Sequence, residues 1–353
     1  MTQVAFCIIC LTALLFSYLA DKKNKISILI FVITILSLAA GLRVESVGLD
    51  TRAYVYNFNN DFPLSWQFDD EGFRYISRFL MKTFNNSSWL LFIYSLITNL
   101  LIVFRLWDFR HKSSFSFMMF LYLTINYINT MNIMRQYVIV AIIFFATRYL
   151  EKKHYAIFTI AVLISSTIHS TALLGLAFLI VYLWKNVTLK HRKWLIVPIF
   201  LFIPIVVVVI FRLQSDNITN YLSQKNTDIN ITYLYRICIF FVIMLLQKIR
   251  IKISLNTSLR HEALIKPISW RDNETIFYLA GLGASSLGMF FAFLSRLGIC
   301  YLMYELVFWG RAVKDGKGRS TAFILSTIFA IYTFALELIL NGSGIFPYAI
   351  QWF

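Results

Sequence analysis

The sequence predicts an all-α integral membrane protein with about twelve transmembrane helices in a single domain, residues 1–353. Hydrophobic residues make up 59% of the chain and charged residues 14%, and the mean hydropathy is +0.70. Soluble domains are usually about half apolar and a quarter charged. Long uncharged runs recur, whereas the alternating segments of a membrane β-barrel do not, so the spans are expected to be helices.

The basic residues follow the pattern of a membrane protein and do not indicate a nucleic-acid partner. The formal charge is +16, but most Lys and Arg lie in short loops between apolar runs, as the positive-inside rule describes. The four cysteines all lie inside apolar runs, with neither a disulfide framework nor zinc-ligand spacing. The first run lacks a basic segment before it and a cleavage site after it, which predicts a spanning helix rather than a signal peptide.

The apolar runs predict the helices in order. They are expected at about Val4–Ala20, Ile26–Leu42, Ser88–Leu106, Phe115–Ile128, Ile133–Tyr149, Tyr155–Ile168, Thr171–Trp184, Trp194–Phe211, Thr232–Leu246, Thr275–Leu294, Leu297–Trp309 and Thr321–Leu340.

Placing the loop Asp21–Lys25 in the cytoplasm puts all but ten of the 33 basic residues in cytoplasmic loops and both termini outside. Four of the ten are arginines within about a turn of an outer helix end: Arg43, Arg135, Arg236 and Arg296. The guanidinium group is a planar donor fork that matches phosphate and carboxylate. These arginines therefore predict an anion site, although lipid anchoring or salt bridges to outer acids would also explain them.

The longest outer loop, residues 43–87, contains a segment with helical periodicity. Apolar residues recur from Phe73 to Phe84, and Arg74, Arg78 and Lys82 lie between them. This pattern predicts an amphipathic helix along the outer membrane surface. Such a helix could form the floor of a substrate entrance or simply rest on the membrane.

The outer side also holds candidate acid–base groups. His169 follows a run of small hydroxyl residues and is a candidate general base; the alternative is a hydrogen-bonded structural histidine. The acidic turn Asp69–Glu71 could bind a divalent metal or be a solvated helix start. Glu337 could face the site, and Glu305 is expected to pair internally. The inner loops lack a phosphate-binding motif, so the substrate must itself supply the energy, as a lipid diphosphate would.

Several motifs, taken in order, resemble the EpsG-like branch of the Wzy polymerases, which elongate bacterial O-antigen, capsule or exopolysaccharide. The matching segments are Gly41-Leu42-Arg43, Val47-Gly48-Leu49-Asp50 with Tyr54, Glu71-Gly72-Phe73, Met134-Arg135-Gln136, Thr167-Ile168-His169-Ser170-Thr171-Ala172, Ser295-Arg296-Leu297-Gly298 with Tyr301, and Pro347-Tyr348. Around His169, Ile and Thr replace the residues usual in the family. The resemblance covers nearly the whole chain.

The resemblance implies a GT-C-like membrane glycosyltransferase at the outer face of the bacterial cytoplasmic (inner) membrane. The donor would be a glycan on undecaprenyl diphosphate and the acceptor a single lipid-linked repeat unit, with no cofactor or metal. A flippase and a chain-length-regulating co-polymerase would be partners. His169 or Asp50 would be the catalytic base. The residues expected to bind the diphosphate or the glycan are Arg43, Arg135, Arg236, Arg296, Tyr54, Glu71 and Gln136.

Three other functions remain open from the sequence. One is an outer-face glycosyltransferase that uses a lipid-phosphate sugar and a metal at Asp50 or Asp69–Glu71. Another is an O-antigen ligase, which shares the donor but uses a different acceptor. The third is a lipid-linked oligosaccharide flippase, a class that usually has internal repeats and broken helices at mid-membrane.

Overall fold

The computed structural model describes residues 2–60, 70–186, 231–256, 268–287, 296, 298–314 and 319–351. Within these ranges the regular secondary structure is helical, apart from an isolated antiparallel bridge between Arg43 and Ile350. The elements are α1 (Thr2–Lys23), α2 (Ser27–Gly41), α3 (Thr51–Asn59), α4 (Glu71–Phe84), α5 (Ser87–Asp108), η1 (Phe109–His111), α6 (Phe115–Leu121), η2 (Tyr122–Asn126), α7 (Tyr127–Asn132), α8 (Met134–Glu151), α9 (Tyr155–Ile168), η3 (Ser170–Gly175), α10 (Leu176–Asn186), α13 (Ile231–Asn256), α14 (Asn273–Leu287), α16 (Ile299–Lys314) and α17 (Arg319–Leu340).

Eleven of the twelve predicted helices overlap helices of the structure. The run Trp194–Phe211 and residues 288–294 of the predicted helix Thr275–Leu294 lie outside the described residues. The amphipathic segment in the first loop is also a helix, α4. Among the described helices, four are long and apolar enough to cross a membrane. These four spans are Gln3–Lys23, Ser87–His111, Thr232–Ile249 and Arg319–Leu340. The protein is therefore an all-helical membrane protein.

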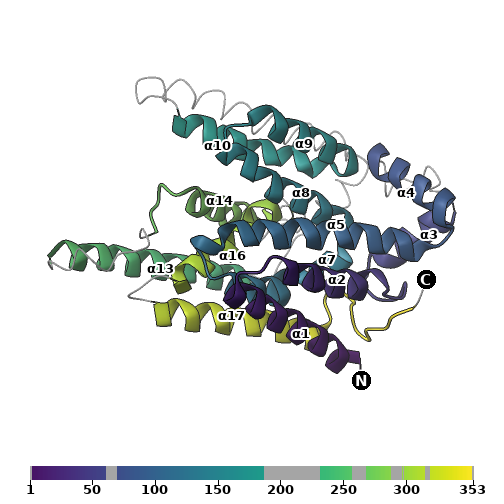
Figure 1. The fold of residues 1–353 in the computed structure, drawn as a ribbon, viewed down its shortest axis with the longest axis horizontal. Helices are drawn as coiled ribbons and strands as arrows, with labels where there is room; N and C mark the ends of the chain where they lie inside the picture. The colour runs from purple at the N-terminus through teal and green to yellow at the C-terminus, as the bar shows by residue number, and fades with distance from the viewer. Residues whose placement is uncertain are drawn as a thin grey trace.

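The helices form an elongated bundle, with the two chain termini and helices α3 and α4 at one end (Figure 1). We call this end of the bundle the Asp70 end. The opposite end, where helix α16 ends, is called the Arg311 end. Helices α2, α5 and α8 pack in succession, and α9 packs on α8. A Cβ on Gly41 would lie 2.5 Å from Cα of Phe92, so glycine allows α2 and α5 to approach closely.

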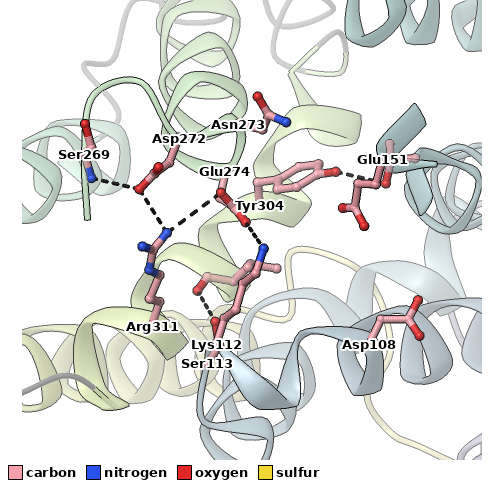
Figure 2. Close-up of polar contacts among 12 residues, drawn as sticks. Asp108, Lys112, Ser113, Glu151, Ser269, Asp272, Asn273, Glu274, Tyr304 and Arg311 are labelled. Carbon is pink, nitrogen blue, oxygen red and sulfur yellow. Dashed lines mark hydrogen bonds and ion pairs between the residues drawn. The ribbon is translucent and has the colours of Figure 1, made fainter. Parts of the chain in front are cut away.

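At the Arg311 end, charged side chains pair with one another (Figure 2). Nη1 of Arg311 lies 3.0 Å from Oδ2 of Asp272 and 3.9 Å from Oε2 of Glu274. Nζ of Lys112 lies 3.9 Å from Oε1 of Glu274. These contacts fasten the start of α14 to α16 and to the α5–α6 turn, so this cluster acts as a structural clamp.

The segment after α17 packs along the loop that follows α2. The amide of Val44 donates to O of Ala349 at 3.1 Å, and the amide of Gln351 donates to O of Leu42 at 2.7 Å. The amide of Gly48 donates to O of Gly344 at 2.7 Å. Gly48 has a φ of +96°, a conformation that favours glycine. The C-terminal segment thus fixes the backbone that leads into Asp50 and α3.

Candidate functional site

One carboxylate oxygen at the Asp70 end contacts both a guanidinium and an imidazole. Oδ2 of Asp70 lies 3.0 Å from Nη1 of Arg135 and 3.3 Å from Nδ1 of His169. The three side chains are between 12% and 19% exposed. They come from the residue before α4, the first turn of α8, and the junction between α9 and η3. The contact places an acid, a cation and a candidate base together, partly accessible to solvent.

Asp70 directs its side chain away from its own helix. An aspartate at this N-terminal capping position usually accepts a hydrogen bond from the first turn, but Asp70 makes no such bond. The adjacent Gly72 explains how Asp70 reaches α9. A Cβ at Gly72 would lie 2.2 Å from Oγ1 and 2.8 Å from the carbonyl carbon of Thr167. Only a glycine fits this contact, which brings α4 against the last turn of α9 and Asp70 to His169.

His169 has the surroundings of a neutral imidazole. Burial lowers the pKa of His169 below its ordinary value of 6.5, and the charge of Arg135 also lowers it, while Asp70 acts in the opposite direction. An ionised carboxylate can only accept hydrogen bonds. Nδ1 of His169 therefore donates to Asp70, which leaves the lone pair on Nε2. In this tautomer, Nε2 can accept a proton from a substrate hydroxyl.

Arg135 lies where two helical segments meet. Helix α7 ends at Asn132, the backbone leaves helical geometry at Ile133, and α8 begins at Met134. Cζ of Arg135 lies 5.5 Å from the ring centroid of Phe73, which is fully buried. A guanidinium at a helix N-terminus adds to the positive end of the helix dipole, so this position favours a bound anion.

Arg43 has a different environment from the anion site that the sequence predicts. Its side chain is fully buried, where Nη2 donates to O of Met131 at 2.8 Å and Nη1 donates to O of Ala40. Both carbonyls lie in last helical turns, of α7 and α2, where intrahelical partners are lacking. Nε also donates to Oγ1 of Thr51 at 3.3 Å. In this geometry the Arg43 side chain links the end of α2, the start of α3 and the end of α7, next to the α7–α8 junction.

Asp50 and Tyr54 share the electrostatic environment of Arg135. The amide of Asp50 donates to Oδ1 of Asn132 at 3.0 Å, which ties the start of α3 to the end of α7. Burial raises the pKa of Asp50, opposed by the charges of Arg296 and Arg135. Burial raises the pKa of Tyr54 to about 12, again opposed by Arg135. Asp50 is therefore a second candidate base near the same arginine.

Gln136 positions Arg296. Nε2 of Gln136 donates to the backbone oxygen of Arg296 at 2.9 Å, and Gln136 itself is buried. The side chain of Arg296 is exposed, and its charge lowers the pKa of both Asp50 and His169. Residues 135 and 136 thus bring two arginines to one site, one through its own side chain and one through this hydrogen bond.

The structure does not bring Arg236 to these residues. Nε of Arg236 lies 3.1 Å from Oε1 of Glu305, which also accepts a hydrogen bond from the hydroxyl of Tyr278 at 3.0 Å. The expectation that Glu305 pairs internally is confirmed. Glu71, in the first turn of α4, is exposed beside Asp70. The contacts described for Arg236 form a separate polar cluster between α13, α14 and α16.

Arg135 and His169, which both contact Asp70, belong to two of the motifs that carry the resemblance in the sequence. A family model, the EpsG family, matches residues 26–350, nearly the whole chain. The chain belongs to the EpsG family. Comparisons with curated proteins and with solved structures give no match. EpsG is a family of Wzy-like polysaccharide polymerases, so membership confirms the resemblance and supports a polymerase-like role for this chain.

The main residue of this candidate site that sequence reasoning missed is Asp70. Its position before an amphipathic helix predicts a solvated turn or a metal ligand, whereas the side chain is 19% exposed and paired with Arg135 and His169. Asp69, the other acid of this turn, lies outside the described residues. The available signal was Gly72, because a glycine in the first turn of a helix indicates close backbone contact.

Proposed function

We propose that this EpsG-family chain joins undecaprenyl-diphosphate-linked oligosaccharide repeat units into a surface polysaccharide at the outer face of the bacterial inner membrane. The growing glycan on its lipid diphosphate is the donor, and a single lipid-linked repeat unit is the acceptor. A flippase delivers the repeat units, and a co-polymerase controls chain length. The observation that carries the proposal is the shared contact of Asp70 with Arg135 and His169.

In the proposed step, an acceptor hydroxyl oxygen attacks the anomeric carbon of the donor. A new glycosidic C–O bond forms, and the bond between that carbon and the diphosphate oxygen breaks. The electron pair leaves with the lipid diphosphate, and the hydroxyl proton moves to a base. No nucleotide is consumed, because the diphosphate ester carries the energy of the reaction.

Arg135 and Arg296 are the groups proposed to stabilise the departing diphosphate. Negative charge develops on the leaving oxygen, and fixed cations aimed at such charge usually provide the largest catalytic contribution. Arg135 is held over the Phe73 ring, and the backbone of Arg296 is held by Gln136. The guanidinium of Arg135 is thereby preorganised before the substrate binds, whereas the exposed side chain of Arg296 reaches the diphosphate from a fixed backbone position.

His169 is the proposed base. Asp70 accepts the Nδ1 hydrogen and so orients Nε2 as the proton acceptor, and the lowered pKa keeps the ring neutral at pH 7. Asp50 remains the alternative base because its raised pKa makes it a better acceptor than an ordinary aspartate. Arg43 and Tyr54 are proposed to support the site as buried residues.

A gel of surface polysaccharide tests the proposal. A deletion strain receives the wild-type gene, an Arg135→Ala copy or an Arg52→Ala copy; Arg52 is an exposed arginine on α3 and serves as the matched control. We expect ladders from the wild type and from Arg52→Ala, and single-repeat material from Arg135→Ala. A normal ladder from Arg135→Ala would contradict the proposed site. A ladder in the deletion strain itself would contradict the polymerase assignment.

A further inference from the structure

A groove at the Arg311 end, outside the proposed active site, is suited to a lipid. Its volume is about 830 Å³, within the range of small-molecule sites. Its walls are the second half of α1, including Leu11 and Leu15, and the first half of α17, including Phe323 and Ile324. Phe117 of α6 lines the groove between them and contacts the ring of Phe323 at a centroid distance of 5.4 Å.

Helices α1 and α17 contact each other beyond the groove, at the Asp70 end. There, Nε2 of Gln3 donates to O of Leu338 at 2.9 Å, and the rings of Phe6 and Phe334 lie 6.4 Å apart. Figure 1 shows the two helices side by side. The lining of α17 runs from Arg319 to Ile331, about 18 Å at 1.5 Å per residue. That length is about half of a ~30 Å hydrocarbon core, the depth of one leaflet.

The lining indicates the chemical class of the occupant. Leu11, Leu15 and Ile324 are between 54% and 64% exposed, so the groove opens sideways into the bilayer rather than into water. An acyl chain can enter it from the membrane. Arg319 and Ser320 are both exposed where the groove begins. A cation and a hydroxyl at that place match an anionic phosphate headgroup. The neighbouring acid Asp21 is engaged with the amide and hydroxyl of Ser116.

We propose that this groove binds one acyl chain of an anionic phospholipid from the leaflet at the Arg311 end, with the lipid phosphate on Arg319. The lipid fills the space between α1 and α17 and holds the two helices apart at a fixed spacing. The site is distinct from the proposed polymerase site at Asp70, at the opposite end of the bundle, and its existence does not depend on the chemistry proposed there.

Lipid binding to the full-length protein tests the proposal by native mass spectrometry. The probes are phosphatidylglycerol and phosphatidylcholine with the same acyl chains. We expect phosphatidylglycerol to bind more tightly, and Arg319→Gln to weaken it about fivefold, the effect of one basic residue at a membrane surface. Lys23→Gln is the matched control, because Lys23 is an exposed cation at the same end that does not line the groove.

A second variant tests the acyl-chain part separately. Ile324→Trp fills the groove from an exposed position, whereas Ile328→Trp adds the same ring at a position on α17 that is 52% exposed and outside the groove. We expect Ile324→Trp to reduce binding of both lipids and Ile328→Trp to leave it unchanged. Equal binding of the two lipids, or unchanged binding in Arg319→Gln and Ile324→Trp relative to their controls, would overturn the proposal.

Discussion

Replacing Asp70 by asparagine tests the geometry of the site at nearly constant volume. The substitution removes the negative charge 3.0 Å from Nη1 of Arg135 and the carboxylate that accepts the Nδ1 hydrogen of His169. An asparagine can present either its oxygen or its amide to the imidazole, so the Nδ1–H tautomer is no longer imposed. The pKa of His169 should fall further, because Asp70 is the group that raises it.

The expected loss of rate in Asp70→Asn equals the rate factor that a positioned general base contributes. A positioned base contributes about 10²–10⁴-fold to a rate, so Asp70→Asn should slow glycosidic-bond formation by a factor in that range. The assay measures the initial rate of lengthening with purified protein in proteoliposomes and lipid-linked repeat units. Helix content should stay close to wild type, and rates are compared per amount of folded protein, because Arg135, 14% exposed, loses the charge partner of its ion pair.

Glu45→Gln provides the control for this experiment. Glu45 is an exposed acid of the same loop, and the substitution changes the net charge by the same amount. We expect Glu45→Gln to retain the wild-type rate. Equal rates for Asp70→Asn and Glu45→Gln would refute the inference that Asp70 organises His169 and Arg135.

Three further predictions concern other parts of the account. Gly72→Ala should abolish activity while the protein still inserts into membranes, because the added Cβ would lie 2.8 Å from the carbonyl carbon of Thr167 and force α4 away from α9; the gel of surface polysaccharide measures this. The acidic limb of the pH–rate profile should lie below pH 6.5, because burial lowers the pKa of His169 and the ring stays neutral, and competent as a base, down to that lowered pKa. Glu305→Gln should lower the melting temperature, because it leaves the charge of Arg236 without its buried partner, a change that costs about 3–5 kcal/mol.

Each of these predictions has a control variant or a result that would separate it from its alternative. Gly283→Ala is the control for Gly72→Ala, since a Cβ at Gly283 meets no atom within 4 Å. A pH limb that disappears in Asp50→Asn but persists in a variant of His169 would assign the base to Asp50. Replacing Arg236 and Glu305 together by Met and Leu should recover most of the stability lost in Glu305→Gln. A melting temperature as low in the double variant would show that charge imbalance is not the cause.

The sequence was sufficient to place most helices because a long uncharged apolar run satisfies its backbone polar groups in a membrane by forming a helix. The break between Asn132 and Met134 was also predictable as a boundary between two apolar runs. The π-helical turn η2 and the 3₁₀ segment η3 were not predicted. Both depend on local packing, and their residues belong to the same apolar runs as the neighbouring α-helices.

The arginines show why the site was only partly predictable. Arg43, Arg135 and Arg236 look alike in sequence, each close to the end of an apolar run. Their surroundings separate them: Arg43 contacts helix-terminal carbonyls, Arg236 contacts Glu305, and Arg135 contacts Asp70. The partners of Arg135 and Arg236 are 65 and 69 residues away, and no local pattern specifies such pairings. Position at a helix end therefore predicts a polar role, and the tertiary fold decides which one.

The most direct test of the account uses purified full-length protein in proteoliposomes, supplied only with lipid-linked repeat units. The wild type should produce a ladder of lengthened glycans with release of lipid diphosphate, and His169→Gln and Arg135→Lys should each leave single repeat units. For Arg135→Lys the reason is that an ammonium lacks the planar donor fork suited to diphosphate. A wild-type protein that makes no ladder, or a ladder unchanged in both variants, would contradict polymerisation at the Asp70–Arg135–His169 site.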